Sequence, residues 1–345
     1  MTKVKICGIT NLEDALLSAK FGADALGFNF YAKSPRSVAP EKAREIIEQV
    51  PPEILKVGVF VNESLEKIRE IAETAKLNAI QLHGEETPEF VREIKTKTNL
   101  EIIKAFRVSP EFNLENVLRY EVDAILLDAY SPEEHGGTGE TFDWEIAGKV
   151  REIFPKMYLA GGLTHENIVR AVGNLNPYGV DVCSGIESRK GVKDKIKLIN
   201  FITKAKTNLA GMPKENLWSL FSAIYLRPQM YLGEKSLSKL QTFLHGFFTA
   251  LHLAKANFET GKYESEEFRK WMGEKVGYGY PNSISCMTHI LRKLDNDEAK
   301  AFDLFFALLE EFKLEKENLS METAQWNKAS DKDLHKFEQN LEKTN

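Results

Sequence analysis

KICGIT, residues 5–10, spans the end of the first of eight short apolar runs in the first 206 residues of the chain. Amphipathic stretches separate these runs. Several of them start with a residue that can cap a helix, as Asn11, Ser64 and Thr164 do. The eight apolar runs are residues 4–7, 25–30, 55–61, 79–83, 102–106, 124–128, 157–161 and 179–183.

This alternation predicts the fold class. Apolar runs without polar interruption are typical of strands that are buried on both faces of a parallel sheet. Strand and helix alternating eight times within about 200 residues predict an α/β fold of the (β/α)8 type, a TIM barrel. A doubly wound open sheet is the competing architecture, but no glycine-rich dinucleotide fingerprint follows the first run. We therefore expect a barrel over residues 1–206.

The pattern changes beyond residue 206. Residues 207–213 are expected to form a linker, and residues 214–345 a smaller all-α domain of unknown function. The apolar positions in this part recur with helical spacing, and residues 229–233 are expected to form a turn. Helices are expected at residues 215–226, 236–258, 265–276, 285–294, 297–312 and 331–341.

Composition limits the class of partner. The 345 residues are 43% apolar and 28% charged, and the net charge of −5 divides into −3 up to Lys206 and −2 beyond it. Neither part has the basic excess that nucleic acid requires, so we expect no nucleic-acid partner. There is no apolar signal core at the N-terminus and no run of about 18 apolar residues, so no membrane contact is expected. Three cysteines without metal-site spacing are typical of the cytoplasm and predict no metal site.

Two chemically active groups end strands of the predicted barrel. Cys7 ends the first run, and Asp128 ends the sixth. Because parallel strands of a barrel end at one mouth, a thiol and a carboxyl group placed there can act as base and acid on one small substrate. The alternative is that Cys7 is a small buried apolar side chain and that Asp128 caps a helix or anchors a loop.

Eight ordered motifs carry a resemblance to a known family. The chain resembles phosphoribosylanthranilate isomerase over residues 1–206, and this resemblance implies the barrel fold. It also implies an Amadori rearrangement in tryptophan biosynthesis, from N-(5-phosphoribosyl)anthranilate to 1-(2-carboxyphenylamino)-1-deoxyribulose 5-phosphate. The motifs are KICGIT (5–10), GADALGFNFYAKSPR (22–36), VGVFVNE (57–63), QLHGEE (81–86), ILLDAY (125–130), GGTGETFDW (136–144), AGGL (160–163) and GVDVCSGIES (179–188).

The resemblance also implies roles for individual residues. Asp128 matches the general acid that protonates the furanose oxygen, and Cys7 matches the general base that removes the proton from C2. These steps need a protonated carboxyl group and a deprotonated thiol at neutral pH. Arg36 matches the residue that binds the anthranilate carboxylate. No metal or organic cofactor is expected, because the substrate supplies its own iminium electron sink.

The loops after the seventh and eighth strands are the expected phosphate site, because barrels often bind phosphate there through backbone amides. The expected partner is therefore a small phosphosugar substrate. The residues expected to bind the phosphate are Gly161, Gly162, Ser184 and Gly185, and those expected to support the pocket are Gln81, His83 and Asp181.

The helical region leaves its role open. RPQMYLG, residues 227–233, resembles an uncharacterised group of small bacterial helical proteins with no known activity. This region is a candidate surface for homo-oligomer formation or for contact with a neighbouring pathway enzyme. The alternative function for the whole chain is a catalytically inactive barrel that serves as a scaffold for a helical interaction or regulatory domain.

Overall fold

The computed structural model describes residues 1–108, 112–129, 144–207, 217–253, 266–277 and 286–315. It divides the chain into two compact units, Met1–Ala210 and Gly211–Asn345. Most of the expected linker (208–213), most of the motif at 136–144 and the expected helix at 331–341 lie outside the described residues.

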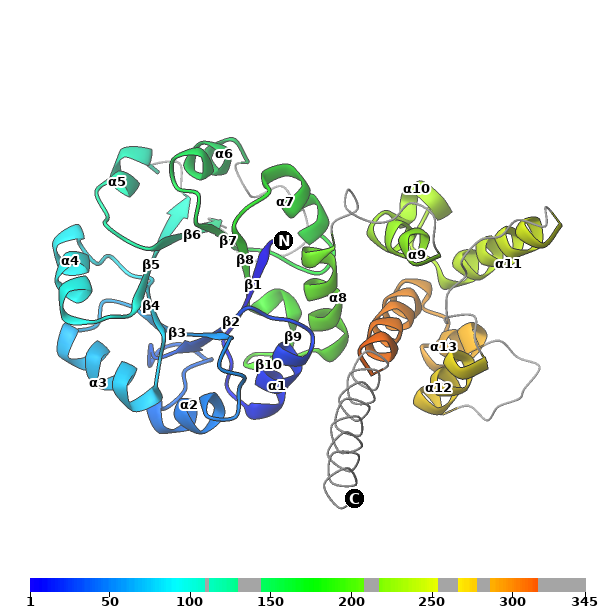
Figure 1. The fold of residues 1–345 in the computed structure, drawn as a ribbon, viewed down its shortest axis with the longest axis horizontal. Helices are drawn as coiled ribbons and strands as arrows, with labels where there is room; N and C mark the ends of the chain where they lie inside the picture. The colour runs from blue at the N-terminus through cyan, green and yellow to red at the C-terminus, as the bar shows by residue number, and fades with distance from the viewer. Residues whose placement is uncertain (109–111, 130–143, 208–216, 254–265, 278–285, 316–345) are drawn as a thin grey trace, which may run out of the picture. The chain divides into compact units, whose positions relative to one another are not determined.

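The first unit is a closed barrel of eight parallel strands (Figure 1). Each strand pairs with its neighbours in the chain, and β8 closes the ring against β1. The predicted (β/α)8 class is confirmed, and the open sheet is excluded. The strands are β1 (Lys3–Cys7), β2 (Ala25–Asn29), β3 (Leu55–Phe60), β4 (Ala79–Leu82), β5 (Glu101–Val108), β6 (Ala124–Ala129), β7 (Met157–Ala160) and β8 (Gly179–Val182).

Among the residues of this unit that the structure describes, eight helices surround the strands (Figure 1). Asn11 and Ser64 cap their helices as expected, because each side chain accepts a hydrogen bond from a backbone N–H of the first turn. A short 3-10 helix, η1 (Ser184–Ile186), and a hairpin of β9 (Glu187–Arg189) and β10 (Val192–Lys193) follow β8. The helices are α1 (Leu12–Lys20), α2 (Pro40–Ile47), α3 (Leu65–Ala75), α4 (Pro88–Lys97), α5 (Leu114–Leu118), α6 (Trp144–Ile153), α7 (Ile168–Leu175) and α8 (Lys195–Lys206).

The helix that Thr164 was expected to cap begins later in the chain. Helix α7 begins at Ile168, because residues 164–167 form a turn that bonds to itself. Asn167 donates from its side chain to the Gly162 carbonyl and accepts from the Thr164 N–H, and these bonds extend the loop after β7.

The pleat of the strands decides which side chains enter the barrel. Val4 and Ile6 of β1 pack outward against the helices in the larger apolar core. Because successive side chains of a strand point to opposite faces, Lys5 and Cys7 point inward. The same alternation turns Asp181 inward on β8 and Asp128 inward on β6. The inner core below them is made of buried apolar side chains, namely Ala25, Val57, Ala79, Ile103, Ala105, Ala124, Leu126, Tyr158 and Ala160.

The described residues of the second unit form helices, as predicted. Its apolar core is rich in phenylalanine, and a further helix over residues 298–315 supplies much of that core. Among the described residues, no helix is long and apolar enough to cross a membrane. The labelled helices are α9 (Leu217–Leu226), α10 (Pro228–Leu232), α11 (Leu237–Leu253), α12 (Glu266–Val276) and α13 (Cys286–Lys293).

The prediction of a turn at residues 229–233 is wrong, because most of these residues belong to a short helix. Helix α9 ends at Leu226, as Pro228 requires, but Pro228 itself opens the short helix α10. Proline is well tolerated in the first turn of a helix, where no internal acceptor awaits its missing N–H. Gly233 then ends the helix with a φ of 79°.

Candidate active site

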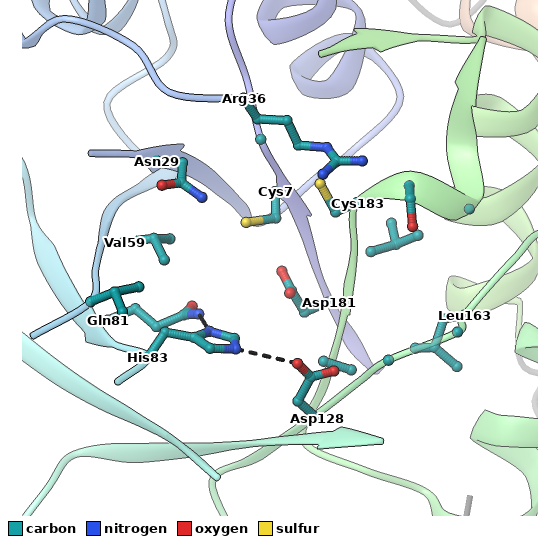
Figure 2. Close-up of a pocket in the computed structure, with 18 residues that line it drawn as sticks. Cys7, Asn29, Arg36, Val59, Gln81, His83, Asp128, Leu163, Asp181 and Cys183 are labelled. Carbon is teal, nitrogen blue, oxygen red and sulfur yellow. Dashed lines mark hydrogen bonds and ion pairs between the residues drawn. The ribbon is translucent and has the colours of Figure 1, made fainter. Parts of the chain in front are cut away.

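A cavity of about 370 Å³ lies at the carboxyl ends of the barrel strands, and Figure 2 shows the residues that line it. It brings together all ten residues that the sequence singled out, from six strands and the loops that follow them. The complete lining is Cys7, Gly8, Asn29, Arg36, Val59, Val61, Gln81, His83, Asp128, Ala160, Gly161, Gly162, Leu163, Asp181, Val182, Cys183, Ser184 and Gly185.

Cys7 is nearly buried at the end of β1, with 9% of its surface exposed. The pKa of its thiol is held well below the ordinary value, first by the neighbouring thiol of Cys183. Burial opposes this effect, but the ammonium groups of Lys5 and Lys193 add to it. The site therefore favours a thiolate at Cys7, which is the form that can accept a proton.

Lys5 and Asp181 form a buried ion pair beneath Cys7. Lys5 Nζ donates to Asp181 Oδ1 at 2.7 Å, and the lysine side chain is fully buried. A Cβ placed on Gly27 would lie 2.8 Å from Cys7 Sγ and 3.1 Å from Lys5 Nζ, so the sulfur and the ammonium group lie against the same point. Burial and the nearby Cys7 raise the pKa of Asp181 to about 6, although Lys5 acts in the opposite direction.

Asp128 lies across the pocket and is joined to His83 (Figure 2). His83 Nε2 lies 3.2 Å from Asp128 Oδ2, and His83 Nδ1 lies 2.9 Å from Gln81 Nε2. Because an amide nitrogen can only donate, Nδ1 accepts and Nε2–H donates to the carboxyl group. Gln81 is 1% exposed and therefore fixes the orientation of the imidazole. The chain Gln81–His83–Asp128 holds Asp128 in one position at the mouth.

Arg36 enters the pocket from the loop after β2 and is held by Glu187 of β9. Its Nε and Nη2 donate to the two carboxylate oxygens at 2.8 and 2.7 Å. Burial acts to raise the pKa of the Glu187 carboxyl, but Arg36 and Lys193 lower it below its ordinary value. This bidentate pair fixes the plane of the guanidinium and leaves Nη1 out of the pairing.

The loops after β7 and β8 meet at one wall of the pocket. Gly161 and Gly162 have φ values of 83° and 61°, a backbone conformation that glycine adopts without steric cost. A Cβ on Gly185 would overlap the carbonyl oxygen of Leu163, so only glycine fits between the two loops. Ser184 opens η1 beside them. The close approach of the loops places backbone amides of both on the same side of the cavity.

Sequence reasoning missed several residues of the site. Lys5 could have been found, because it lies two positions before Cys7 and therefore shares its inward face. Cys183 has no role among the residues expected at the site, yet it lines the cavity together with Cys7. Glu187 and Lys193 reach the site through the β9–β10 hairpin, and no spacing rule indicated this hairpin. Within the described residues, no group of three His, Cys, Asp or Glu side chains is placed to hold a metal ion.

The fold and the cavity together define a class. A parallel barrel with a thiol, a carboxyl group and an arginine at the carboxyl ends of its strands has the arrangement of barrel enzymes that act on small substrates. Residues 4–204 match the family model described as N-(5′-phosphoribosyl)anthranilate (PRA) isomerase. The chain therefore belongs to this isomerase family.

Individual relatives agree with the family model. The chain is 53% identical to N-(5′-phosphoribosyl)anthranilate isomerase of Pelobacter propionicus over 206 residues, which are 60% of this chain and 96% of that protein. The crystal structure of phosphoribosyl anthranilate isomerase from Thermotoga maritima matches with a TM-score of 0.56 and 49% sequence identity. This match covers 60% of the present chain and 99% of the Thermotoga chain. Another isomerase, solved in complex with reduced 1-(o-carboxyphenylamino)-1-deoxyribulose 5-phosphate, is 47% identical with a TM-score of 0.54, covering 60% of this chain and 99% of that one.

Proposed function

We propose that the barrel converts N-(5′-phosphoribosyl)anthranilate into 1-(2-carboxyphenylamino)-1-deoxyribulose 5-phosphate, with Cys7 as general base and Asp128 as general acid. Family membership makes the chain an isomerase of tryptophan biosynthesis. The observation that carries the two roles is the placement of a thiol with a lowered pKa and a carboxyl group on different walls of one cavity.

The reaction starts at Asp128. Its proton goes to the ring oxygen of the ribose, the C1–O bond breaks, and the nitrogen lone pair forms an iminium ion with C1. As the general acid, Asp128 must carry a proton before this step. His83 fixes the carboxyl group through Oδ2, so Oδ1 is the oxygen that can face the ring.

Cys7 acts in the second step. The iminium ion withdraws electrons from C2, so the proton there becomes acidic and passes to the Cys7 thiolate. The electron pair of the C2–H bond forms an enolamine, which becomes the ketone when C1 gains a proton and the C2 hydroxyl loses one. Lys5 and Lys193 supply the positive field that keeps the thiolate available in a buried place.

The ends of the substrate are held by charge and by backbone amides. Arg36 Nη1 donates a hydrogen bond to the anthranilate carboxylate, while Nε and Nη2 of the same guanidinium remain paired with Glu187. Backbone amides of Gly161, Gly162, Ser184 and Gly185 receive the phosphate, as loops after the last two strands of a barrel commonly do. Gln81 supports the pocket by its hydrogen bond to His83, and Asp181 supports it by its ion pair with Lys5.

The direct test of the activity uses the full chain and substrate generated in its assay mixture. Loss of the anthranilate-type fluorescence should greatly exceed the spontaneous rate. A folded chain that leaves the fluorescence at the spontaneous rate would contradict the proposal and would favour the inactive-scaffold hypothesis. No observation on the described residues favours that hypothesis, because the cavity keeps the thiol, the carboxyl group and the arginine.

Arg36→Met is expected to raise KM about 10- to 100-fold, because a hydrogen bond to a charged group contributes about 1.5–3 kcal/mol. The fall in kcat should be smaller, since the carboxylate is bound in both ground state and transition state. Steady-state kinetics on the full chain would measure both. Arg189→Met makes the same charge change at an exposed position of β9 and should leave KM unchanged. An unchanged KM in Arg36→Met would remove the carboxylate-binding role.

The helical unit is proposed to mediate self-association. It is additional to the barrel, which by itself spans 96% of the Pelobacter relative, and its short helix α10 exposes Met230 (72%) and Tyr231 (38%). Light scattering on the full chain and on residues 1–206 would test this. Equal oligomeric states would contradict self-association and leave contact with a pathway enzyme as the alternative.

A further inference from the structure

A fully buried lysine lies behind the site, at the seam where the barrel closes. Strands β1 and β8 pair in parallel up to Ile6 opposite Val182, and Cys7 and Cys183 are the next residues along the chain at these two points. Lys193 of β10 bridges them. Its Nζ donates to the Cys7 carbonyl at 2.6 Å and to the Cys183 carbonyl at 3.3 Å. The ammonium group therefore continues the seam one residue beyond the paired strands.

The third acceptor of the same ammonium group is the carboxylate that holds Arg36. Lys193 Nζ lies 3.2 Å from Glu187 Oε1, and Glu187 binds the Arg36 guanidinium through both oxygens, at 2.8 and 2.7 Å. An ammonium group has three N–H donors, and three oxygen atoms accept them here. The side chain of Lys193 is fully buried and that of Glu187 is 5% exposed, so solvent screens this pair little.

A backbone contact fixes where this lysine lies. The Lys193 N–H donates to Asp14 Oδ2 of α1 at 2.9 Å, and the bond is buried. Neither Lys193 nor Glu187 lines the cavity, so each can act on a substrate only through other residues. The residues that they contact are Cys7 and Arg36, which are the ones the proposed reaction uses.

We propose that Lys193 is a positioning residue for the isomerase, and that its ammonium group joins Cys7 and the carboxylate-binding Arg36 into one unit. This inference rests on the roles proposed above for those two residues. Toward Cys7 the link is a hydrogen bond to its own carbonyl, which fixes the peptide from which the thiol projects. Toward Arg36 the link is Glu187, which Lys193 holds where it pairs with the guanidinium. Figure 2 shows Arg36 and Cys7 on one side of the pocket, opposite Asp128.

The charge of Lys193 also favours the thiolate form of Cys7. Among the described residues around this thiol, three cations face two carboxylates, so one positive charge is left to balance a thiolate. Without Lys193 none would be left, and a buried thiolate would be disfavoured. The Cys183 thiol adds no charge, because the neighbouring Cys7 and burial raise its pKa. The groups in this balance are Lys5 of β1, Arg36 of the loop after β2, Asp181 of β8, Cys183 after it, Glu187 of β9 and Lys193 of β10.

The test uses Lys193→Gln in the full chain, with Lys190→Gln as the control. Glutamine removes the charge but keeps two N–H donors for the buried carbonyl groups, so the chain should fold, and thermal unfolding would verify this first. Lys190→Gln makes the same change at an exposed position of the same hairpin. The rate of carboxamidomethylation of Cys7 by iodoacetamide would be measured against pH, with peptide mass spectrometry to separate the cysteines. Steady-state kinetics would give KM.

Lys193→Gln is expected to move the alkylation midpoint of Cys7 upward by about one pH unit, the effect of one nearby charge. KM should rise about three- to tenfold, since residues of one hydrogen-bond network are energetically coupled. Lys190→Gln should change neither quantity. An unchanged midpoint in a folded Lys193→Gln chain would overturn the link to Cys7, and an unchanged KM would overturn the link to Arg36.

Glu187→Gln keeps the proposal testable if Lys193→Gln does not fold. Its amide oxygen can still accept from Lys193, but the second oxygen that pairs with Arg36 is lost. KM should rise about tenfold, and the Cys7 midpoint should not rise, because a negative charge near the thiolate is removed. A wild-type KM, or a midpoint that rises, would contradict the arrangement of one unit.

The acid limb of kcat/KM separates this inference from the proposed function. If the limb and the alkylation midpoint shift together in Lys193→Gln, Cys7 is the base and Lys193 positions it. If neither shifts, Lys193 has no such role, while the base role of Cys7 stands on its own tests. If the midpoint shifts and the limb does not, Cys7 is not the base, and the positioning role in the reaction falls with it.

Discussion

Asp128→Asn is expected to lower kcat about 10²- to 10⁴-fold, the usual contribution of a general acid, with KM little changed. Asparagine has nearly the same shape and can still accept the hydrogen bond from His83 through its amide oxygen. It has no proton to give to the ring oxygen, so the furanose cannot open at the enzymatic rate. The rate of fluorescence loss under saturating substrate measures the effect.

The control for this variant is Glu121→Gln. It makes the same charge change just before β6, at an exposed side chain (69%) at the opposite end of that strand, and should retain full activity. An Asp128→Asn chain with wild-type kcat would contradict the assignment. Asp181 would then be the candidate acid, because burial raises its pKa to about 6 and leaves it partly protonated near neutral pH.

Cys7→Ser is expected to lower kcat by a similar factor, about 10²- to 10⁴-fold. Serine fits the same space, but its hydroxyl group does not ionise near neutral pH, so it cannot take the C2 proton. The wild-type kcat/KM should fall as pH decreases through the pKa of Cys7, and this limb should lie below the ordinary range of a thiol. In Cys7→Ser the limb should be absent.

Cys286→Ser supplies the matched control, since it makes the same chemical change in the helical unit and should leave kcat unchanged. Full turnover by a folded Cys7→Ser chain would remove the base role from Cys7. Cys7 would then serve only as a small buried apolar side chain of β1, which is the alternative interpretation of this residue.

The barrel could be predicted from the sequence because its strands are continuous apolar runs. Several of the helices between them also start at a residue whose side chain can cap the first turn. Local bonds decided the points where prediction and structure differ. Asn167 bonds back to Gly162 and Thr164 and delays α7, and Pro228 starts a helix where a turn was expected. Hydrogen bonds of one side chain cause the first difference, and the position of one proline causes the second. The spacing of apolar residues in the sequence contains no information about either.

The candidate site was predictable where residues end strands, as Cys7 and Asp128 do. It was not predictable where a partner comes from far along the chain. Arg36 meets Glu187 across 151 positions, and Lys193 meets the Cys7 carbonyl across 186. These contacts depend on how the hairpin after β8 folds over the mouth, which a single sequence does not specify.

The measurement that tests the two roles most directly is the deuterium isotope effect on single-turnover loss of substrate fluorescence, with deuterium at C2 of the ribose. In Cys7→Ser, removal of the C2 proton limits the rate, so the isotope effect should be large and normal. In Asp128→Asn, ring opening limits the rate, so the effect should be close to unity. The reverse pattern, with the large effect in Asp128→Asn, would contradict the account and assign the base to Asp128.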